Sequence, residues 1–174
     1  KIGTLTWSID EKGTFRLDGE GELRDFEGPD MEITPWHHHA DEDKKMIIGD
    51  GVTKIGSYTF PELTNLKQVH FGKSVKYIGS CAFCSCPIED LKLNDGLKEI
   101  GYAAFSQASA KELVIPDSVE KLGSDAISGD FDTIKIGKGV KDFTYSSFIT
   151  PAKKFIVDPE NDFLSNDSHG VLFF

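Results

Sequence analysis

The chain has 174 residues, of which 39% are hydrophobic, and its formal net charge is −10. This apolar content is sufficient for one domain with its own core. Because a strongly acidic surface repels phosphate backbones, we expect no nucleic acid partner. No apolar run approaches the ~20 residues of a membrane-spanning helix, so we expect no membrane insertion in this segment.

The N-terminal residues have the pattern of a β-hairpin. Polar and apolar residues alternate in Thr4–Ile9, turn residues follow in Asp10–Gly13, and alternation resumes in Thr14–Gly19 and continues toward Phe26. This segment does not fit the repeat that follows it. We expect it to cover the apolar end and the open strand edge of the first repeat. Residues 1–43 are therefore predicted to be a hairpin cap and a connector.

The connector, residues 27–43, contains three adjacent histidines. His37, His38 and His39, followed by the acidic residues Asp41–Asp43, could bind a divalent metal ion. The alternative is a solvated loop in which these residues cluster by chance. We favour this alternative because adjacent histidines on a flexible loop form at best a weak site, and we expect no metal site.

Residues 44–174 repeat one plan with a period of 21–23 residues. An apolar residue, usually phenylalanine, recurs in phase at Phe60, Phe83, Phe105, Ile127 and Phe148. A further copy, which matches the repeat less well, begins at Lys154. A fixed period in the low twenties indicates a solenoid, because one such unit buries its apolar face only by stacking on its neighbours. We expect about five to six repeats in one continuous structural domain.

Each copy begins with a short alternating strand. Val69 and Phe71 in one copy, and Leu91 and Leu93 in the next, lie on the side that we expect to be buried. Because successive strands run in the same direction, they should pair as a parallel sheet. The predicted strands are residues 46–48, 69–71, 91–93, 113–115, 134–136 and 155–157.

Each strand is followed by a turn, a glycine and a short segment such as Ser80–Phe83. The segment is too short for a long helix, and we expect one helical or 3₁₀ turn there. The glycine, Gly79 in this copy, either takes a backbone angle that other residues resist or lets the coil approach its neighbour closely. The predicted fold is a right-handed α/β solenoid of low helix content. It has a parallel sheet on one face and short helical or 3₁₀ turns on the other.

Two stretches carry a family pattern most closely: FGKSVKYIGSCAF at Phe71–Phe83 and IPDSVEKLGSDAI at Ile115–Ile127. They resemble the BspA-like leucine-rich repeats of surface and secreted proteins of anaerobic bacteria and some protists. The resemblance covers residues 44–174. The sequence of residues 5–23 is similar to the module that often precedes these repeats, and residues 153–174 resemble a segment that follows them.

The resemblance implies a leucine-rich-repeat solenoid at the cell surface or outside the cell, in a fragment of a larger protein. It implies that Trp36 packs over the first coil and is not a platform for a ligand. It also implies adhesion, with a protein or glycan on host or neighbouring cells as the partner.

The cysteines Cys81, Cys84 and Cys86 have the spacing C-x-x-C-x-C, which could indicate a metal site. In the repeat, however, Cys81 stands where Tyr58 and Ala103 stand in neighbouring copies, and a zinc site needs a fourth ligand. The resemblance also implies packing cysteines. We therefore expect structural thiols and no metal. A disulfide from Cys81 to Cys84 or Cys86 remains an alternative in an exported protein.

No nucleophile motif and no phosphate-binding loop occurs in the sequence, so we expect neither an enzyme nor a cofactor. Two functions remain: a binding or adhesion module, and a structural spacer or stalk with no ligand of its own. Solenoids bind along extended surfaces, so the predicted ligand surface is the solvent-facing side of the sheet. Alternation assigns to it Lys45, Ile47, Gln68, His70, Asp90, Lys92, Glu112, Val114, Thr133, Lys135, Lys154 and Ile156.

Overall fold

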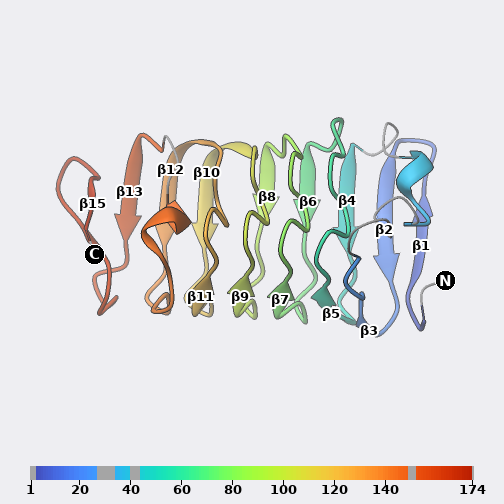
Figure 1. The fold of residues 1–174 in the computed structure, drawn as a ribbon, viewed down its shortest axis with the longest axis horizontal. Helices are drawn as coiled ribbons and strands as arrows, with labels where there is room; N and C mark the ends of the chain where they lie inside the picture. The colour runs from blue at the N-terminus through green and yellow to red at the C-terminus, as the bar shows by residue number, and fades with distance from the viewer. Residues whose placement is uncertain (1–2, 27–33, 40–43, 149–151, 174) are drawn as a thin grey trace.

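The chain forms an elongated stack of β-coils that runs from the N-terminus to the C-terminus (Figure 1). The computed structural model describes residues 3–26, 34–39, 44–148 and 152–173, and only the backbone of His38, Tyr145 and Phe148. In these residues helix is limited to the 3₁₀ segments η2 (His37–His39) and η3 (Tyr145–Phe148), and no helix is long and apolar enough to cross a membrane. The architecture is a parallel β-solenoid with almost no helix.

Two sheets form one side of the solenoid, here called the front face. Every neighbouring pair in them is parallel except β1 and β2, which form an antiparallel hairpin. The predicted parallel pairing is therefore confirmed. The first sheet contains, in order, β1 (Thr6–Ile9), β2 (Thr14–Asp18), β4 (Lys45–Ile48), β6 (Gln68–His70) and β8 (Asp90–Lys92). The second contains β10 (Ser109–Ile115), β12 (Asp130–Ile136) and β13 (Lys154–Val157).

The prediction of one continuous sheet is wrong, because the sheet divides between β8 and β10. Pro116 follows β10 directly. At the equivalent position of three other coils, Gly49, Gly137 and Asp158 each donate their amide hydrogen to a carbonyl of the preceding coil. Proline has no amide hydrogen, so Pro116 cannot form this bond.

A further sheet, which was not predicted, forms a second side of the solenoid. Its strands are parallel and two to four residues long, which is too short to show alternation in the sequence. The hairpin region contributes β3, and four repeats contribute one strand each, at a buried apolar pair such as Val75 and Ile78. The strands are β3 (Gly21–Glu22), β5 (Val52–Ile55), β7 (Tyr77–Ile78), β9 (Glu99–Ile100) and β11 (Lys121–Leu122). A small antiparallel pair, β14 (Ser165–Asn166) and β15 (Leu172–Phe173), lies near the C-terminus.

The third side consists mainly of turns, and among the described repeats only η3 has the expected 3₁₀ form at this position. The α/β prediction therefore overstated the helix. The amides of Tyr58, Phe60 and Glu62 donate to the carbonyls of Ser80, Ala82 and Cys84 in the next coil. The next two coils repeat this arrangement, so all these donors point toward the C-terminal neighbour. Positive φ angles accompany the pattern at Tyr58, Glu62, Cys81, Ser85, Ala103, Gln107 and Asp125.

The recurring glycine acts through close approach, the second of its two predicted roles. A Cβ atom on Gly79 would lie 2.4 Å from the amide nitrogen of Ser57, and one on Gly101 would lie 2.7 Å from that of Ser80. Positive φ occurs instead two residues later, as at Cys81, where φ is 52°. The glycine therefore sets the distance between neighbouring coils.

A phenylalanine ladder runs along the core, as predicted. Phe60, Phe83 and Phe105 are fully buried, and their successive ring centroids are 5.4 and 5.5 Å apart. Ile127 continues the ladder as a buried residue, whereas the side chain of Phe148 lies outside the described part of the chain. The predicted flanking residues Ile55, Ile78, Ile100 and Leu122 are buried as well.

The predicted hairpin forms, but its second arm belongs to the solenoid. β2 pairs in parallel with β4, which places Phe15 opposite Met46, and β3 pairs in parallel with β5. Residues 14–26 thus occupy a coil although their sequence does not match the repeat. Trp36 is buried, and its ring centroid is 4.8 Å from that of Phe60, as expected for a residue that packs over the first coil.

Candidate ligand-binding face

The predicted ligand residues come together on the front face in two rows, which the parallel ladders place in register. One row is Lys45, Gln68 and Asp90 on the first sheet and Glu112, Thr133 and Lys154 on the second. The other is Ile47, His70 and Lys92, then Val114, Lys135 and Ile156. All twelve side chains are at least partly exposed, whereas the alternate positions, such as Val69 and Leu113, are buried.

The hairpin adds residues to this face that the sequence did not assign to it. Thr14 lies opposite Lys45, and Arg16 lies opposite Ile47, so that β2 extends both rows. Arg16 is exposed and adds a cation at this end. The alternation of Thr14–Asp18 indicates that Thr14 and Arg16 face outward. To assign them to the front face also requires the parallel pairing of β2 with β4, which the sequence did not indicate.

The half of the face on the first sheet is polar, and its charges interact with one another. Nε2 of His70 lies 3.3 Å from Oδ2 of Asp90, and Nζ of Lys92 lies 3.8 Å from the same oxygen. One carboxylate is therefore shared by two basic side chains from neighbouring strands. This half offers hydrogen-bonding groups but little apolar area.

The half on the second sheet exposes aliphatic side chains. Val114 is 49% exposed and Ile156 is 37% exposed, and Lys135 stands between them in the same row. Nζ of Lys135 lies 2.9 Å from Oε2 of Glu112, so its charge is partly neutralised. This half combines apolar contact area with an ion pair.

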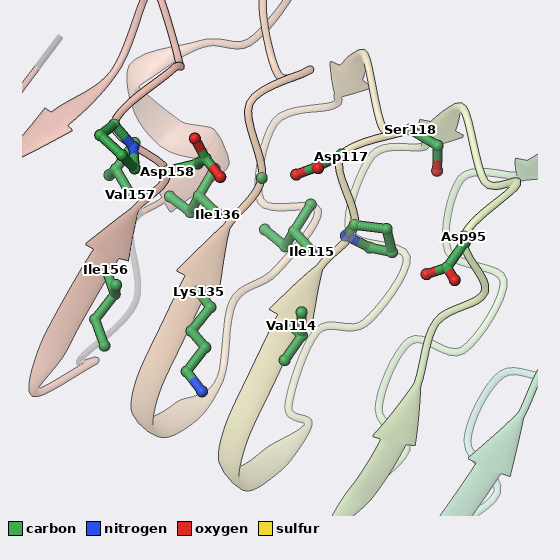
Figure 2. Close-up of a pocket in the computed structure, with 13 residues that line it drawn as sticks. Asp95, Val114, Ile115, Asp117, Ser118, Lys135, Ile136, Ile156, Val157 and Asp158 are labelled. Carbon is green, nitrogen blue, oxygen red and sulfur yellow. The ribbon is translucent and has the colours of Figure 1, made fainter.

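A groove of about 640 Å³ lies beside these side chains, at the carboxyl ends of β10, β12 and β13. Figure 2 shows Val114, Lys135 and Ile156 on three adjacent strands, with Asp117 and Asp158 beyond the strand ends. Three aspartates line the groove, with Asp95 contributed by the preceding coil. The groove is further lined by Ile115, Pro116, Ser118, Ile136, Gly137, Val157 and Pro159.

The aspartates at the groove also stabilise turns, the role that the sequence indicated for Asp117. Oδ1 of Asp117 accepts a hydrogen bond from the amide of Lys138 in the next coil, at 3.2 Å. Oδ1 of Asp158 accepts one from the amide of Glu160, at 2.8 Å. No local pattern indicated that three turns would meet at one groove, because the aspartates are separated in the sequence by about one repeat or more.

The cysteines are free thiols that pack within the repeat. Sγ of Cys86 is buried and donates a hydrogen bond to the carbonyl of Phe60, at 3.1 Å. Burial raises the pKa of Cys86 to about 12, and it raises the pKa of the partly buried Cys84 to about 11, with a further contribution from Cys81. Thiols with such high pKa values stay protonated at neutral pH.

The histidine triplet forms η2, and the ring centroid of His39 lies 5.9 Å from that of Trp7. Asp41–Asp43, which were considered as partners for the histidines, lie outside the described residues. Within the residues that the structure describes, no group of three or more His, Cys, Asp or Glu side chains is placed to hold a metal ion.

Known proteins share this architecture. A leucine-rich repeat protein from Eubacterium ventriosum aligns with a TM-score of 0.88 at 20% identity, over 98% of this chain and 46% of its own. The T. pallidum leucine-rich repeat protein TpLRR aligns with a TM-score of 0.58 at 15% identity, over 81% and 72%. The pneumococcal vaccine antigen PcpA aligns with a TM-score of 0.55 at 18% identity, over 97% and 51%. At these identities the similarity concerns the fold.

The chain spans about half the length of the Eubacterium ventriosum and pneumococcal proteins. No curated protein sequence matches it. The BspA type leucine-rich repeat region matches residues 39–152 in six copies, which is more than half of the chain. The repeats, the parallel solenoid and this match agree, and the chain belongs to the BspA type leucine-rich repeat family.

Proposed function

We propose that this chain is a non-catalytic protein-binding or adhesion domain of a bacterial surface or secreted protein and that its partner docks on the front face. Repeat regions of this family generally serve as binding modules without catalytic activity. The structural relative described as a pneumococcal vaccine antigen supports a location at the bacterial surface. The function requires no cofactor.

One observation carries the proposal: aliphatic side chains are exposed beside a groove on the front face. Folding does not require Val114 or Ile156 at these positions, because the inward neighbours Leu113 and Phe155 supply the core contacts of their strands. Exposed apolar groups beside polar and charged side chains are typical of an interaction surface. The row of residues across neighbouring coils allows one partner to contact several strands.

A structural spacer is the second candidate, and ion pairs between neighbouring coils favour it. Lys67 pairs with Glu89 at 2.8 Å, and Lys98 pairs with Glu120 at 2.9 Å. Such pairs join successive coils along the solenoid axis and involve no ligand. Each exposed pair contributes only about 0–1 kcal/mol, so the pairs explain solubility and regular stacking better than a dedicated mechanical role.

An array of extracellular-matrix proteins and glycans tests the proposal. Three versions of the full chain are compared: the wild type, the front-face variant H70S/K92S/V114S/K135S, and the control variant Y77S/Y102S. The control changes two tyrosines that are 47% and 51% exposed but lie away from the front face. Circular dichroism and thermal melting establish that all three are folded.

We expect the wild type and the control variant to bind the same protein or proteins, and the front-face variant to bind none of them. Equal binding by all three versions would place the site outside the front face. Binding to glycans alone would change the class of partner. No binding by the wild type to any member of the array would favour the spacer.

A further inference from the structure

We propose that the groove at β10, β12 and β13 binds an extended basic peptide segment of the partner, in which an aliphatic side chain lies close to a lysine or arginine. The inference rests on the proposed function and specifies the partner of the same face. Three features of the groove support it: its apolar side, its unpaired carboxylates, and the spacing of its residues.

The apolar side of the groove selects aliphatic side chains. Val114 and Ile156 flank Lys135 in one register row and expose 49% and 37% of their surface. Their strands are two ladder steps apart, which corresponds to about 10 Å at the usual strand spacing. An extended peptide advances about 3.4 Å per residue, so it crosses this distance in about three residues. A short extended segment can therefore contact both aliphatic side chains.

The opposite side of the groove carries negative charge that is only partly offset, by Lys138, whose ammonium lies beyond ion-pair distance of Asp117 and Asp158. Asp95, Asp117 and Asp158 line it, and within the described part of the chain none of them forms an ion pair. The nearby cations are already engaged, since Lys135 pairs with Glu112 at 2.9 Å and Lys138 with Glu160 at 2.8 Å. Lysines elsewhere on the solenoid are commonly paired with an acid of a neighbouring coil. The groove therefore combines carboxylates that form no ion pair among the described residues with the exposed aliphatic side chains of β10 and β13.

The arrangement favours a cationic side chain over a metal ion. The three carboxylates come from three different coils, and they do not form a group that could hold a metal among the described residues. A lysine or arginine has a flexible stem and can reach one of several separated carboxylates, whereas a divalent ion needs its oxygen ligands within about 2.0–2.6 Å. The net charge of −10 adds attraction for a basic partner at longer range.

A random peptide library displayed on phage, selected against the full chain, provides the test. The peptide that is enriched most is synthesised with a fluorescent label. Its affinity is measured by anisotropy for the wild type and three variants. Variant D95N/D117N/D158N removes the charges but keeps an Oδ1 acceptor at each position, so the turn bonds to Lys138 and Glu160 are preserved. Variant V114S/I156S removes the aliphatic side chains, and the control variant Y77S/Y102S changes two exposed tyrosines away from the front face.

We expect the selected peptides to combine Lys or Arg with Leu, Ile or Val within about three residues. The triple asparagine variant and V114S/I156S should each bind the peptide about tenfold more weakly, and Y77S/Y102S should bind it like the wild type. Raising the salt concentration from about 50 to about 300 mM should weaken binding to the wild type more than to the asparagine variant.

Failure of the inference can be distinguished from failure of the proposed function. The absence of any enriched peptide, enrichment without basic residues, or full binding by the asparagine variant would overturn the groove assignment. If the array partner is then lost with H70S/K92S, a variant of the polar half of the face, the front-face function holds and only the groove is wrong. If neither half of the face affects the array partner, the proposed function fails as well.

Discussion

The indole N–H of Trp36 donates a hydrogen bond of 2.9 Å to the carbonyl oxygen of Thr59, and both residues are buried. On this side of the solenoid, the amides of each coil donate to carbonyls of the next coil. The carbonyl of Ser57 receives its hydrogen bond from the amide of Phe26 in the preceding coil. The carbonyl of Thr59 receives its hydrogen bond from the side chain of Trp36 instead. Trp36 thus substitutes for backbone at the N-terminal end of the ladder.

Trp36→Phe should therefore destabilise the protein by more than the smaller ring alone accounts for. The substitution keeps an aromatic ring but leaves the buried carbonyl of Thr59 without this donor, which costs about 1–3 kcal/mol. Urea unfolding followed by circular dichroism measures the change. Trp7→Phe is the control, because Trp7 is only partly buried and stacks on Phe15. Equal losses in the two variants would show that ring area, and not the hydrogen bond, accounts for the effect.

The phenylalanine ladder makes Phe105→Ala a severe substitution. Phe105 is fully buried and stacks on Phe83 with an angle of 8° between the ring planes. Its truncation should leave a cavity between neighbouring coils and cost ~3–5 kcal/mol in the free energy of unfolding. Tyr102→Ala, at an exposed position of the same repeat, should change this free energy by less than about 0.5 kcal/mol. A melting temperature of the Phe105 variant equal to that of the wild type would contradict the core assignment.

Two backbone positions should respond in opposite ways. A methyl group on Gly79 would lie within 3 Å of the backbone of Ser57, so Gly79→Ala should force neighbouring coils apart and cost about 1–3 kcal/mol or more. Gln107 is exposed and has a φ angle of 70°, so Gln107→Gly should relieve strain and stabilise the protein by up to about 1 kcal/mol. Thermal melting of both variants provides the measurement. Stabilisation by Gly79→Ala would contradict the close-approach role.

The outward row of the front face could be predicted because burial forces alternation. In Gln68–His70 the middle residue, Val69, enters the core, and its neighbours must face solvent. The same argument placed Lys135 and Ile156 correctly, since both follow buried residues in strands of the same kind. The phase of the repeat was therefore sufficient to identify which side chains lie on the face.

Other features depend on contacts that no local pattern reports. The strand Tyr77–Ile78 is two residues long, and only its pairing with neighbouring coils makes it a strand. The groove combines turns from different coils, so Asp95 and Asp158 look like unrelated turn residues in the sequence. Arg16 was missed because its strand has no repeat pattern, although it pairs in register with β4.

A carboxylate joins the first two coils on the side of β3 and β5. Oδ1 of Asp25 accepts a hydrogen bond from the amide of Ser57 at 2.8 Å, and it lies 3.2 Å from Nζ of Lys54. The bond from Ser57, followed by the interaction with Lys54, lowers the pKa of Asp25 below its ordinary value of 3.8. Both interactions favour the charged form of the carboxylate.

This shift predicts a pH-dependent effect of Asp25→Asn. Because the pKa of Asp25 is lower in the folded state, its charge adds stability that is fully present above about pH 4 and is lost as the pH falls through the folded-state pKa. At pH 7 the asparagine variant should unfold at a lower urea concentration than the wild type. The difference should shrink as the pH falls below about 4, because the wild-type carboxyl then becomes protonated and is uncharged, like the asparagine side chain. Paired urea titrations at each pH separate this effect from the general acid sensitivity of the chain. A difference that stays constant from neutral to acidic pH would contradict the role of the charge.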